Sequence, residues 1–249
     1  MKFNIINIQE LDSTVSYAQR QIENGKLHEG DVVFTLTQEQ GRGQGDNFWE
    51  SEPDSNLLIS IILEPKMINA SQQFILTQLV SNSIIELIKE YVNNELVKIK
   101  WPNDIYINNK KIAGILFQNF IKGDRIEYSI AGIGINVNQK KFFSDAPNPI
   151  SLIHYTQKQI NLVKLLTKLL DKIGNNYDKF IFENNHSQLK SVYIDNLYRF
   201  GEWAIFSDLN SKFNGKIIDI DNYGRLIVEL ISGEKRKYMF KEIEFTNDQ

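Results

Sequence analysis

Short apolar runs mark the first half of the chain. Residues 3–8, 31–36 and 56–63 are rich in β-branched and aromatic side chains and have the lengths of strands. The third run, NLLISIIL, shows no alternation of apolar and polar positions. A strand without alternation is typically buried on both faces, so we expect residues 56–63 to be covered on both sides.

Three segments place their apolar residues with the period of a helix. The first begins after Ser13, a residue suited to an N-cap, and ends near Gly25, which is suited to a C-cap. Residues 71–91 and 162–182 carry longer apolar stripes. The leucines of the last stripe are typical of core packing rather than of a cofactor site. Residues 139–160 lack a clear period, and we expect them to be irregular.

The middle of the chain reads as a tight meander of strands. Trp101-Pro102 cannot continue a helix, and Asn108-Asn109 and residues 122–124 are turn signals. Asn103 and Asp104 follow the first break, and Lys111 opens the strand after the second. The expected strands are residues 97–99, 105–107, 111–120 and 125–137.

From about Gly201 the pattern changes to short strands separated by glycine-containing turns. The turn signals are Asn214-Gly215, Tyr223-Gly224 and Ser232-Gly233. The strands expected between them are residues 203–206, 216–220, 225–230 and 237–240. We therefore divide the chain into a larger domain of residues 1–196 and a small β-barrel-like domain of residues 197–249.

Composition and charge narrow the class of protein. With 42% hydrophobic and 24% charged residues the chain is ordinary globular material, and its net charge of −3 gives no basis for a nucleic-acid-binding surface. The absence of cysteine excludes disulfides, thiolate chemistry and cysteine-bound zinc, and the three histidines show no ligand spacing. No signal peptide or membrane-length run is present, so we expect a soluble, cytoplasmic protein.

Two glycine-containing segments can approach a ligand closely. The segment Gly41-Arg42-Gly43-Gln44-Gly45 combines exposed backbone amides with a guanidinium, which suits an anion, although it is neither a P-loop nor a convincing dinucleotide fingerprint. Trp49 can stack on a nucleobase or belong to the core. The second segment, GIGIN at residues 132–136, indicates either close approach by a ligand or a β-bulge.

Taken together, the motifs LDST, GRGQ followed by Trp49, KWPND, KxxGIL and GIGIN resemble those of the biotin protein ligase family, the biotin–[acetyl-CoA-carboxylase] ligases. The resemblance covers residues 11–138. It implies an α+β fold in which helices flank the mixed β-sheet of a class II synthetase-like biotin/lipoate ligase. By architecture alone, it extends to a small C-terminal SH3-like β-barrel.

The family resemblance implies a two-step reaction. The biotin carboxylate attacks the α-phosphorus of ATP to give biotinyl-5′-AMP, and a lysine of a biotin carboxyl carrier domain then takes the acyl group. ATP, Mg²⁺ and biotin are the expected substrates and metal, with no tightly bound prosthetic group. The expected partner is the carrier domain of a biotin-dependent carboxylase. No DNA or membrane partner is expected, and a homodimer can form through a sheet edge.

The resemblance also implies the site residues, with Lys111 and Arg42 as the catalytic cations. The implied biotin site comprises Ser13, Thr14, Gln38, Gly41, Arg42, Gly43, Lys111 and Gly114. The implied ATP or adenylate site comprises Gln44, Asn47, Trp49, Asn103, Asp104 and Asn136. Asn103 and Asp104 can either bind Mg²⁺ or position Lys111, and the sequence leaves both roles open.

The chain departs from the usual GRGRxGRxW loop at three positions. Gln44 replaces the second arginine, Asp46 a glycine and Asn47 a third arginine, so we expect a weaker hold on the adenylate. The LDST motif is reached by residue 14, which leads us to expect no preceding helix-turn-helix domain. The alternatives are a lipoate or octanoate ligase or transferase of the same fold, and a non-catalytic biotin sensor.

Overall fold

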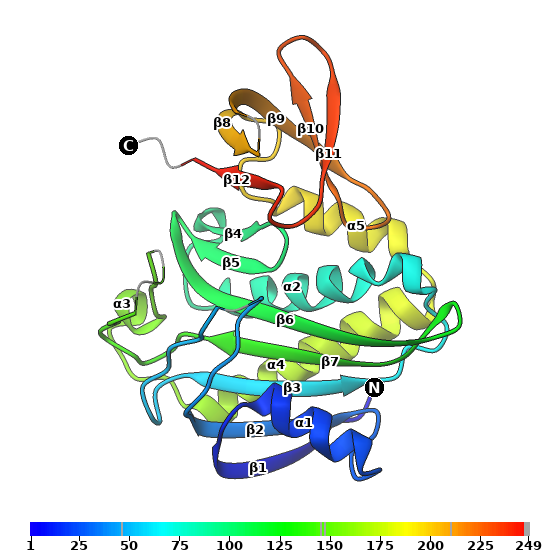
Figure 1. Cartoon of the computed structure of the whole chain (residues 1–249). Coiled ribbons are helices and arrows are strands. Elements are labelled where there is room, and N and C mark those ends of the chain that lie inside the picture. Colours follow the sequence, from blue (N-terminus) through cyan, green and yellow to red (C-terminus); the bar gives the residue numbers. More distant parts are fainter. Residues whose placement is uncertain (46, 145, 147, 210, 247–249) are drawn as a thin grey trace.

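The fold is built on two β-sheets that follow one another along the chain (Figure 1). This computed structural model describes residues 1–45, 47–144, 146, 148–209 and 211–246. The first sheet has the strand order β1-β2-β3-β7-β6-β5-β4. Its strands are β1 (Asn4–Leu11), β2 (Asp31–Gln38), β3 (Leu57–Leu63), β4 (Val97–Lys100), β5 (Asp104–Ile107), β6 (Lys110–Lys122) and β7 (Arg125–Ile135). The β1–β2 pair is parallel and the other pairs are antiparallel.

Helices cover both faces of this sheet. Helix α1 (Thr14–Glu23) packs on one face, over β2, β3 and β7, whereas α2 (Phe74–Ile88) and α4 (Leu162–Tyr177) pack on the other (Figure 1). All seven residues of β3 are buried, which confirms the expectation drawn from its unbroken apolar run. The remaining helices are η1 (Ala70–Gln72), η2 (Asn94–Leu96), α3 (Ile153–Thr156), the π-helix η3 (Asp178–Phe182) and α5 (His186–Asp195).

The second sheet is antiparallel and has the order β11-β10-β9-β8-β12. Its strands are β8 (Trp203–Asp208), β9 (Lys212–Ile220), β10 (Leu226–Leu230), β11 (Lys235–Tyr238) and β12 (Ile243–Phe245). In the described residues the strand pairing does not close into a ring. The arrangement is compatible with the SH3-like architecture expected, while the domain boundary after residue 196 stays a prediction.

The two sheets are joined by direct contacts near β4. The backbone of Ile99 exchanges hydrogen bonds with Asn196 and Tyr198, and the indole N–H of Trp101 donates to the carbonyl of Gly224 at 2.9 Å. These contacts cover the β4 edge and hold the second sheet above the end of the first. The groove between them is therefore built from residues far apart in sequence.

Several element boundaries differ from those expected. Asn214-Gly215 is not a turn but lies inside β9, where a Cβ on Gly215 would press on Val228 and Phe206. Close packing, rather than chain reversal, accounts for this glycine. The helix expected at 162–182 ends as α4 at Tyr177 and continues as a π-turn. Helices α3 and α5 and strand β12 were not anticipated. In the described part of the chain no helix has the length and apolar character needed to cross a bilayer.

Candidate active site

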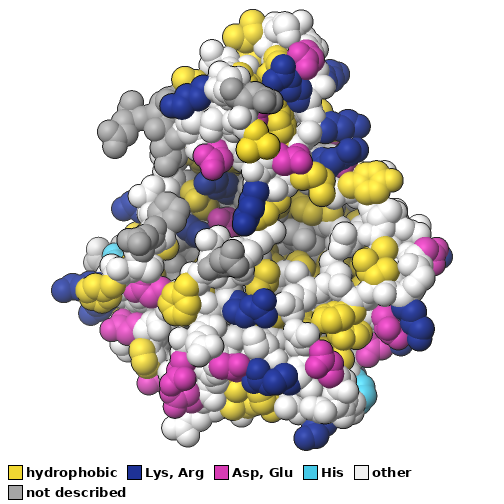
Figure 2. Space-filling model, viewed as in Figure 1, with side chains coloured by type: hydrophobic (Ala, Val, Ile, Leu, Met, Phe, Trp, Pro, Cys, Tyr) yellow, Lys and Arg dark blue, Asp and Glu magenta, His cyan; other side chains and the backbone are white. Residues whose placement is uncertain are grey.

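A cavity of about 770 Å³ lies between the α1 face of the first sheet, the segment after β2 and the second sheet. Figure 2 shows the surface hollowed below the C-terminal sheet, with Lys or Arg side chains at the hollow. Most of the residues expected at the site line this cavity. They are Ser13, Thr14, Gln38, Arg42, Gly43, Gln44, Asn47, Trp49, Asn103, Asp104, Lys111 and Gly114.

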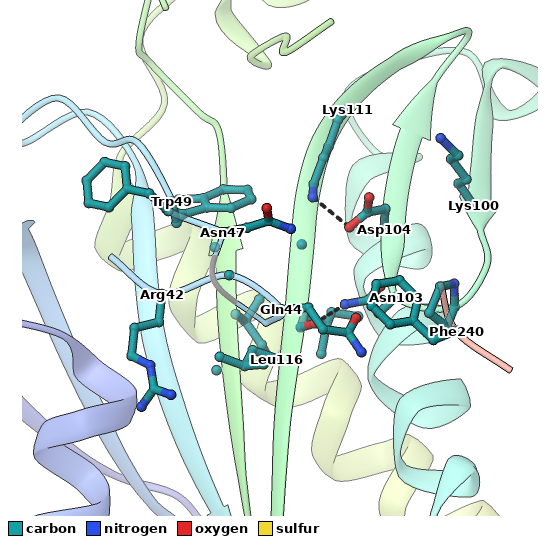
Figure 3. Close-up of a pocket in the computed structure, with 18 of the residues that line it drawn as sticks. Arg42, Gln44, Asn47, Trp49, Lys100, Asn103, Asp104, Lys111, Leu116 and Phe240 are labelled. Carbon is teal, nitrogen blue, oxygen red and sulfur yellow. Dashed lines mark hydrogen bonds and ion pairs between the residues drawn. The ribbon is translucent and has the colours of Figure 1, made fainter. Parts of the chain in front are cut away.

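An ion pair marks the centre of the site. Nζ of Lys111 lies 2.7 Å from a carboxylate oxygen of Asp104, and both side chains are about three-quarters buried (Figure 3). The two residues reach this position because β5 and β6 are paired, with Asp104 opposite Gly114. The ammonium also lies 5.5 Å from the ring centre of Trp49, within cation–π range. Lys111 is therefore held by the sheet before any ligand arrives.

Asn103 ties the Trp101-Pro102 turn to β6. Its side-chain amide donates to the backbone carbonyl of Ile115, and the backbone carbonyl of Asn103 accepts from the Ile115 amide at 3.0 Å. One N–H of the Asn103 side chain is thus committed to the backbone, and its side-chain oxygen is left for a ligand. The Lys111–Asp104 contact is the one that a positioning role requires, and both roles left open by the sequence stay predictions.

Two glycines on neighbouring strands make the floor on which Trp49 lies. Gly114 of β6 and Gly134 of β7 stand opposite each other. A Cβ on Gly134 would come within 2.5 Å of the indole, and one on Gly114 would lie 2.9 Å from it and 3.3 Å from Lys111. Only residues without a Cβ fit under the ring. Of the two explanations for GIGIN, the β-bulge is wrong, because β6 and β7 pair here without one. The group that approaches the backbone closely is the Trp49 side chain, and approach by a ligand stays a prediction.

The end of the cavity beside α1 is polar and buried. The amide of Thr14 donates to the side-chain carbonyl of Gln38 at 2.9 Å, and the Thr14 hydroxyl accepts from Ser60 at 2.9 Å. Ser13 precedes the helix, but its hydroxyl makes no capping bond and is buried without a partner in the described residues. A ligand that carries both donors and acceptors would satisfy these groups.

The segment after β2 is less tightly engaged. Arg42 is exposed, and its backbone forms an isolated antiparallel β-bridge with Phe48. Its side chain points away from Lys111 (Figure 3). The buried side-chain oxygen of Gln44 has no partner in the described part of the chain. The two expected catalytic cations therefore both line the cavity but do not converge. Asp46, one of the departures noted in the sequence, lies outside the described residues.

Two expected site residues do not line the cavity. Gly41 is buried behind the loop, where a Cβ would collide with the backbone of Trp49 and the amide of Gln38. Asn136 follows β7 and is 3% exposed, and its backbone amide bonds the carbonyl of Ile112. Gly41 therefore lets the loop pack closely at Trp49 and Gln38 but does not line the cavity itself. The role expected for Asn136 at the adenylate stays a prediction.

The second sheet contributes residues that the sequence reading missed. The lining includes Phe240, Lys241, Ile243, Glu244 and Phe245, together with Lys100 of β4. Burial lowers the pKa of the Lys100 ammonium, which donates to the Tyr106 hydroxyl at 3.1 Å and lies 5.4 Å from the Phe245 ring centre. No local motif marks residues 240–245, because only the folding of the second sheet against β4 brings them to the cavity.

The model of the Biotin/lipoate A/B protein ligase family matches residues 7–136, which are 130 of the 249 residues. The chain belongs to this family. The matched segment runs from β1 through the end of β7, and so contains the ion pair, the glycine floor and the polar end of the cavity.

Relatives within the Biotin/lipoate A/B protein ligase family carry biotin ligase names. The chain is 29% identical over 236 residues to the bifunctional ligase/repressor BirA of Bacillus spizizenii, covering 92% of this chain and 71% of that protein. It is 29% identical to biotin–protein ligase 2 of Arabidopsis thaliana over 193 residues, covering 73% of this chain and 55% of that one. The biotin protein ligase of Aquifex aeolicus, solved with biotin and ATP, matches with a TM-score of 0.78 and 27% identity, over 98% of this chain and 99% of that chain.

Proposed function

We propose that this protein is an ATP-dependent biotin protein ligase. It activates biotin as biotinyl-5′-AMP and transfers the biotinyl group to a lysine of a biotin carboxyl carrier protein. The observation that carries the proposal is that one cavity combines the Lys111–Asp104 ion pair, a buried polar end and the Trp49 indole on its glycine floor. The similarity to named biotin ligases over almost the whole chain supports it.

The geometry suits adenylation without a covalent enzyme intermediate. We infer that the ureido ring of biotin occupies the polar end formed by Ser13, Thr14 and Gln38, so that its carboxylate points toward Lys111. The carboxylate oxygen then attacks the α-phosphorus, and the bond to pyrophosphate breaks. Because the attacking group and the phosphate are both anionic, a cation fixed beside them stabilises the developing charge. The pre-set ion pair means that little reorganisation is needed.

The nucleotide base is assigned to the side of the cavity next to Trp49. An indole that lies flat on Gly114 and Gly134 presents a rigid aromatic surface for stacking. In the second step, the amine of the acceptor lysine attacks the acyl carbon of the mixed anhydride, AMP leaves, and the amine loses a proton. The proton passes to solvent, and the chain supplies the position and charge that bring the amine to the acyl carbon.

Magnesium fits this site as a metal held mainly by the substrate. In the described residues no three acidic or histidine side chains gather to form a metal site. Asp104 and the side-chain oxygen of Asn103 offer at most two ligands, which matches Mg²⁺ bound through phosphates and water. When bound, Mg²⁺ neutralises phosphate charge. The variant Asp104→Asn tests the role of Asp104. A lower turnover at an unchanged Mg²⁺ concentration for half-maximal activity supports positioning of Lys111, whereas a higher Mg²⁺ concentration supports metal binding.

We further propose that a folded carrier domain docks at the open edge of the first sheet by strand addition. In the described residues β1 has no strand on its outer side, whereas β4 is covered by the backbone around Leu197. The same edge can form a homodimer, so acceptor and dimer would compete. A dimer population that is unchanged by acceptor titration would contradict the shared edge.

No DNA partner is proposed, since a net charge of −3 gives little affinity for phosphate backbones. A gel shift against a biotin-operon promoter checks this, and salt-resistant, site-specific retention would contradict it. A cytoplasmic location, where ATP is available as the expected substrate, stays a proposal.

The deciding experiment is ATP–pyrophosphate exchange. We expect exchange that depends on biotin and is not supported by lipoate or octanoate. Exchange with lipoate in place of biotin would favour the lipoate ligase alternative. Biotin binding without any exchange would favour the sensor alternative.

A further inference from the structure

The segment 41–49 supplies little positive charge for binding a nucleoside triphosphate. Within these residues Arg42 is the one cation in the sequence, and Asp46 offsets it. Arg42 is exposed and points away from Lys111 (Figure 3). Lys111 in turn is neutralised in part by Asp104 at 2.7 Å. A ligand with several phosphate charges therefore needs a further cation from another part of the fold.

The second sheet places a lysine against this segment. Among the described residues, the cations that line the cavity are Arg42, Lys100, Lys111 and Lys241. Lys241 meets the loop directly, since a Cβ built on Gly45 would lie 2.8 Å from its Nζ. Lys100 is half-buried and bonded to Tyr106, whereas Lys241 is exposed and forms no ion pair with any described residue. Its ammonium is therefore free to bind an anion that enters beneath the loop.

The backbone at Lys241 would favour glycine rather than lysine. The turn from β11 to β12 is closed by the amide of Glu242, which donates to the carbonyl of Met239 at 3.1 Å. Lys241 is the third residue of this four-residue turn and has a φ of 69°. Because Phe240, the second residue, has no positive φ, this is a type II turn, in which glycine is preferred at the third position. A lysine at a strained position beside the cavity points to a use for its side chain.

We propose that Lys241 binds the phosphates of the nucleotide and supplies the charge that the 41–49 segment lacks. The inference rests on the proposed function. Arg125, the other cation that could be considered, is unsuitable because it lies at the β6–β7 hairpin, where its guanidinium donates to the carbonyl of Met67. The second sheet would then contribute a phosphate-binding cation to the nucleotide site.

The test compares ATP binding in four variants. Lys241→Gly removes the cation and suits the backbone, so it should fold at least as well as the wild type. We expect it to raise the KM for ATP in biotin-dependent exchange about threefold to tenfold, and Lys241→Glu to raise it further. Lys241→Arg keeps the positive charge and should have a KM for ATP close to that of the wild type. Lys235→Glu on β11, an exposed lysine outside the lining, is the matched control and should leave the KM unchanged.

Two further readouts separate charge from structure. The Kd for biotin should be the same in all four variants, and added salt should weaken ATP binding less in Lys241→Gly than in the wild type. An unchanged KM for ATP in Lys241→Glu would overturn the proposal, as would a change confined to the carrier-protein KM or an equal loss of biotin and ATP binding. A wild-type protein without biotin-dependent exchange would instead contradict the proposed function itself.

Discussion

The two walls of the cavity are built in different ways. One wall is the face of β5, β6 and β7, where Asp104, Lys111, Gly114 and Gly134 are held by strand register. The other wall is residues 42–44 and 47–49 with the second sheet's lining residues 240, 241 and 243–245. Among the described residues, the buried side-chain oxygen of Gln44 has no partner there and Lys241 forms no ion pair. The charged pair of the sheet wall is already formed without a ligand, whereas the cation and the buried oxygen of the second wall still lack partners.

This difference predicts a division of labour. Groups fixed by the sheet need no reorganisation when charge develops, so they should control the rate of the chemical step. Groups on the loop and turn gain partners only when a nucleotide is present, so they should control how tightly it is held and how fast it leaves. Substitutions on the two walls should therefore separate turnover from retention.

The largest effect is expected at Lys111. Lys111→Ala removes the cation next to the reacting carboxylate and should slow biotin-dependent ATP–pyrophosphate exchange by about 10²–10³-fold. The neighbouring Lys110 is exposed and does not line the cavity, so Lys110→Ala is the matched control. Biotin affinity, measured by calorimetry, should change much less than the rate. An unimpaired exchange rate in Lys111→Ala would remove Lys111 from the mechanism.

The next effect is expected where the walls meet. Gly134→Ala would place a methyl group within 2.5 Å of the Trp49 indole and force the ring off its floor. If the base stacks on Trp49, the affinity for ATP should fall by about tenfold, since stacking contributes ~1–3 kcal/mol per base. The control is the same substitution in a Trp49→Ala background, where no ring is left to displace. An equal loss in both backgrounds would show that the methyl group acts on something other than the indole.

The same contrast explains what could be anticipated from the sequence. The strands, their turns and the closeness of Asn103, Asp104 and Lys111 follow from local signals between residues 97 and 137, and the structure brings these residues together as expected. Close approach by a ligand at Gly134 was one of two readings left open. The group that the structure places there is the Trp49 side chain, 85 positions earlier in the chain. Local pattern can mark a floor but cannot say which distant side chain lies on it.

The second wall was anticipated only in part. The glycine-rich segment was expected at the site, but the direction of Arg42 depends on the loop conformation and carries no signal in composition. The contribution of residues 240–245 depends on how the second sheet docks, through contacts such as Trp101 with the Gly224 carbonyl. That docking joins positions 123 apart in sequence. Asn214-Gly215 was misread for a related reason, because a glycine needed for close packing has the same local signature as a turn.

The smallest effect is expected at Gln44. Its neutral amide can donate one ordinary hydrogen bond to a phosphate, worth about 0.5–1.5 kcal/mol, whereas an arginine would form a charge-assisted bond worth about 1.5–3 kcal/mol. Gln44→Arg should therefore gain on the order of 1 kcal/mol and slow the release of preformed biotinyl-AMP several-fold. Labelling of lysines on non-cognate proteins should decrease slightly.

The background in which Gln44→Arg is measured decides what it means. If Lys241 already supplies part of the missing charge, an added arginine has less left to neutralise, and its effect should be smaller in the wild type than in Lys241→Gly. The two positions would then be coupled, as expected for groups that share one ligand. The measurement is the release rate of biotinyl-AMP from the wild type, the two single variants and the double variant. Equal effects in both backgrounds would show that the loop and the turn act on different parts of the ligand, and faster release from the arginine variant would show that Gln44 already binds the adenylate fully.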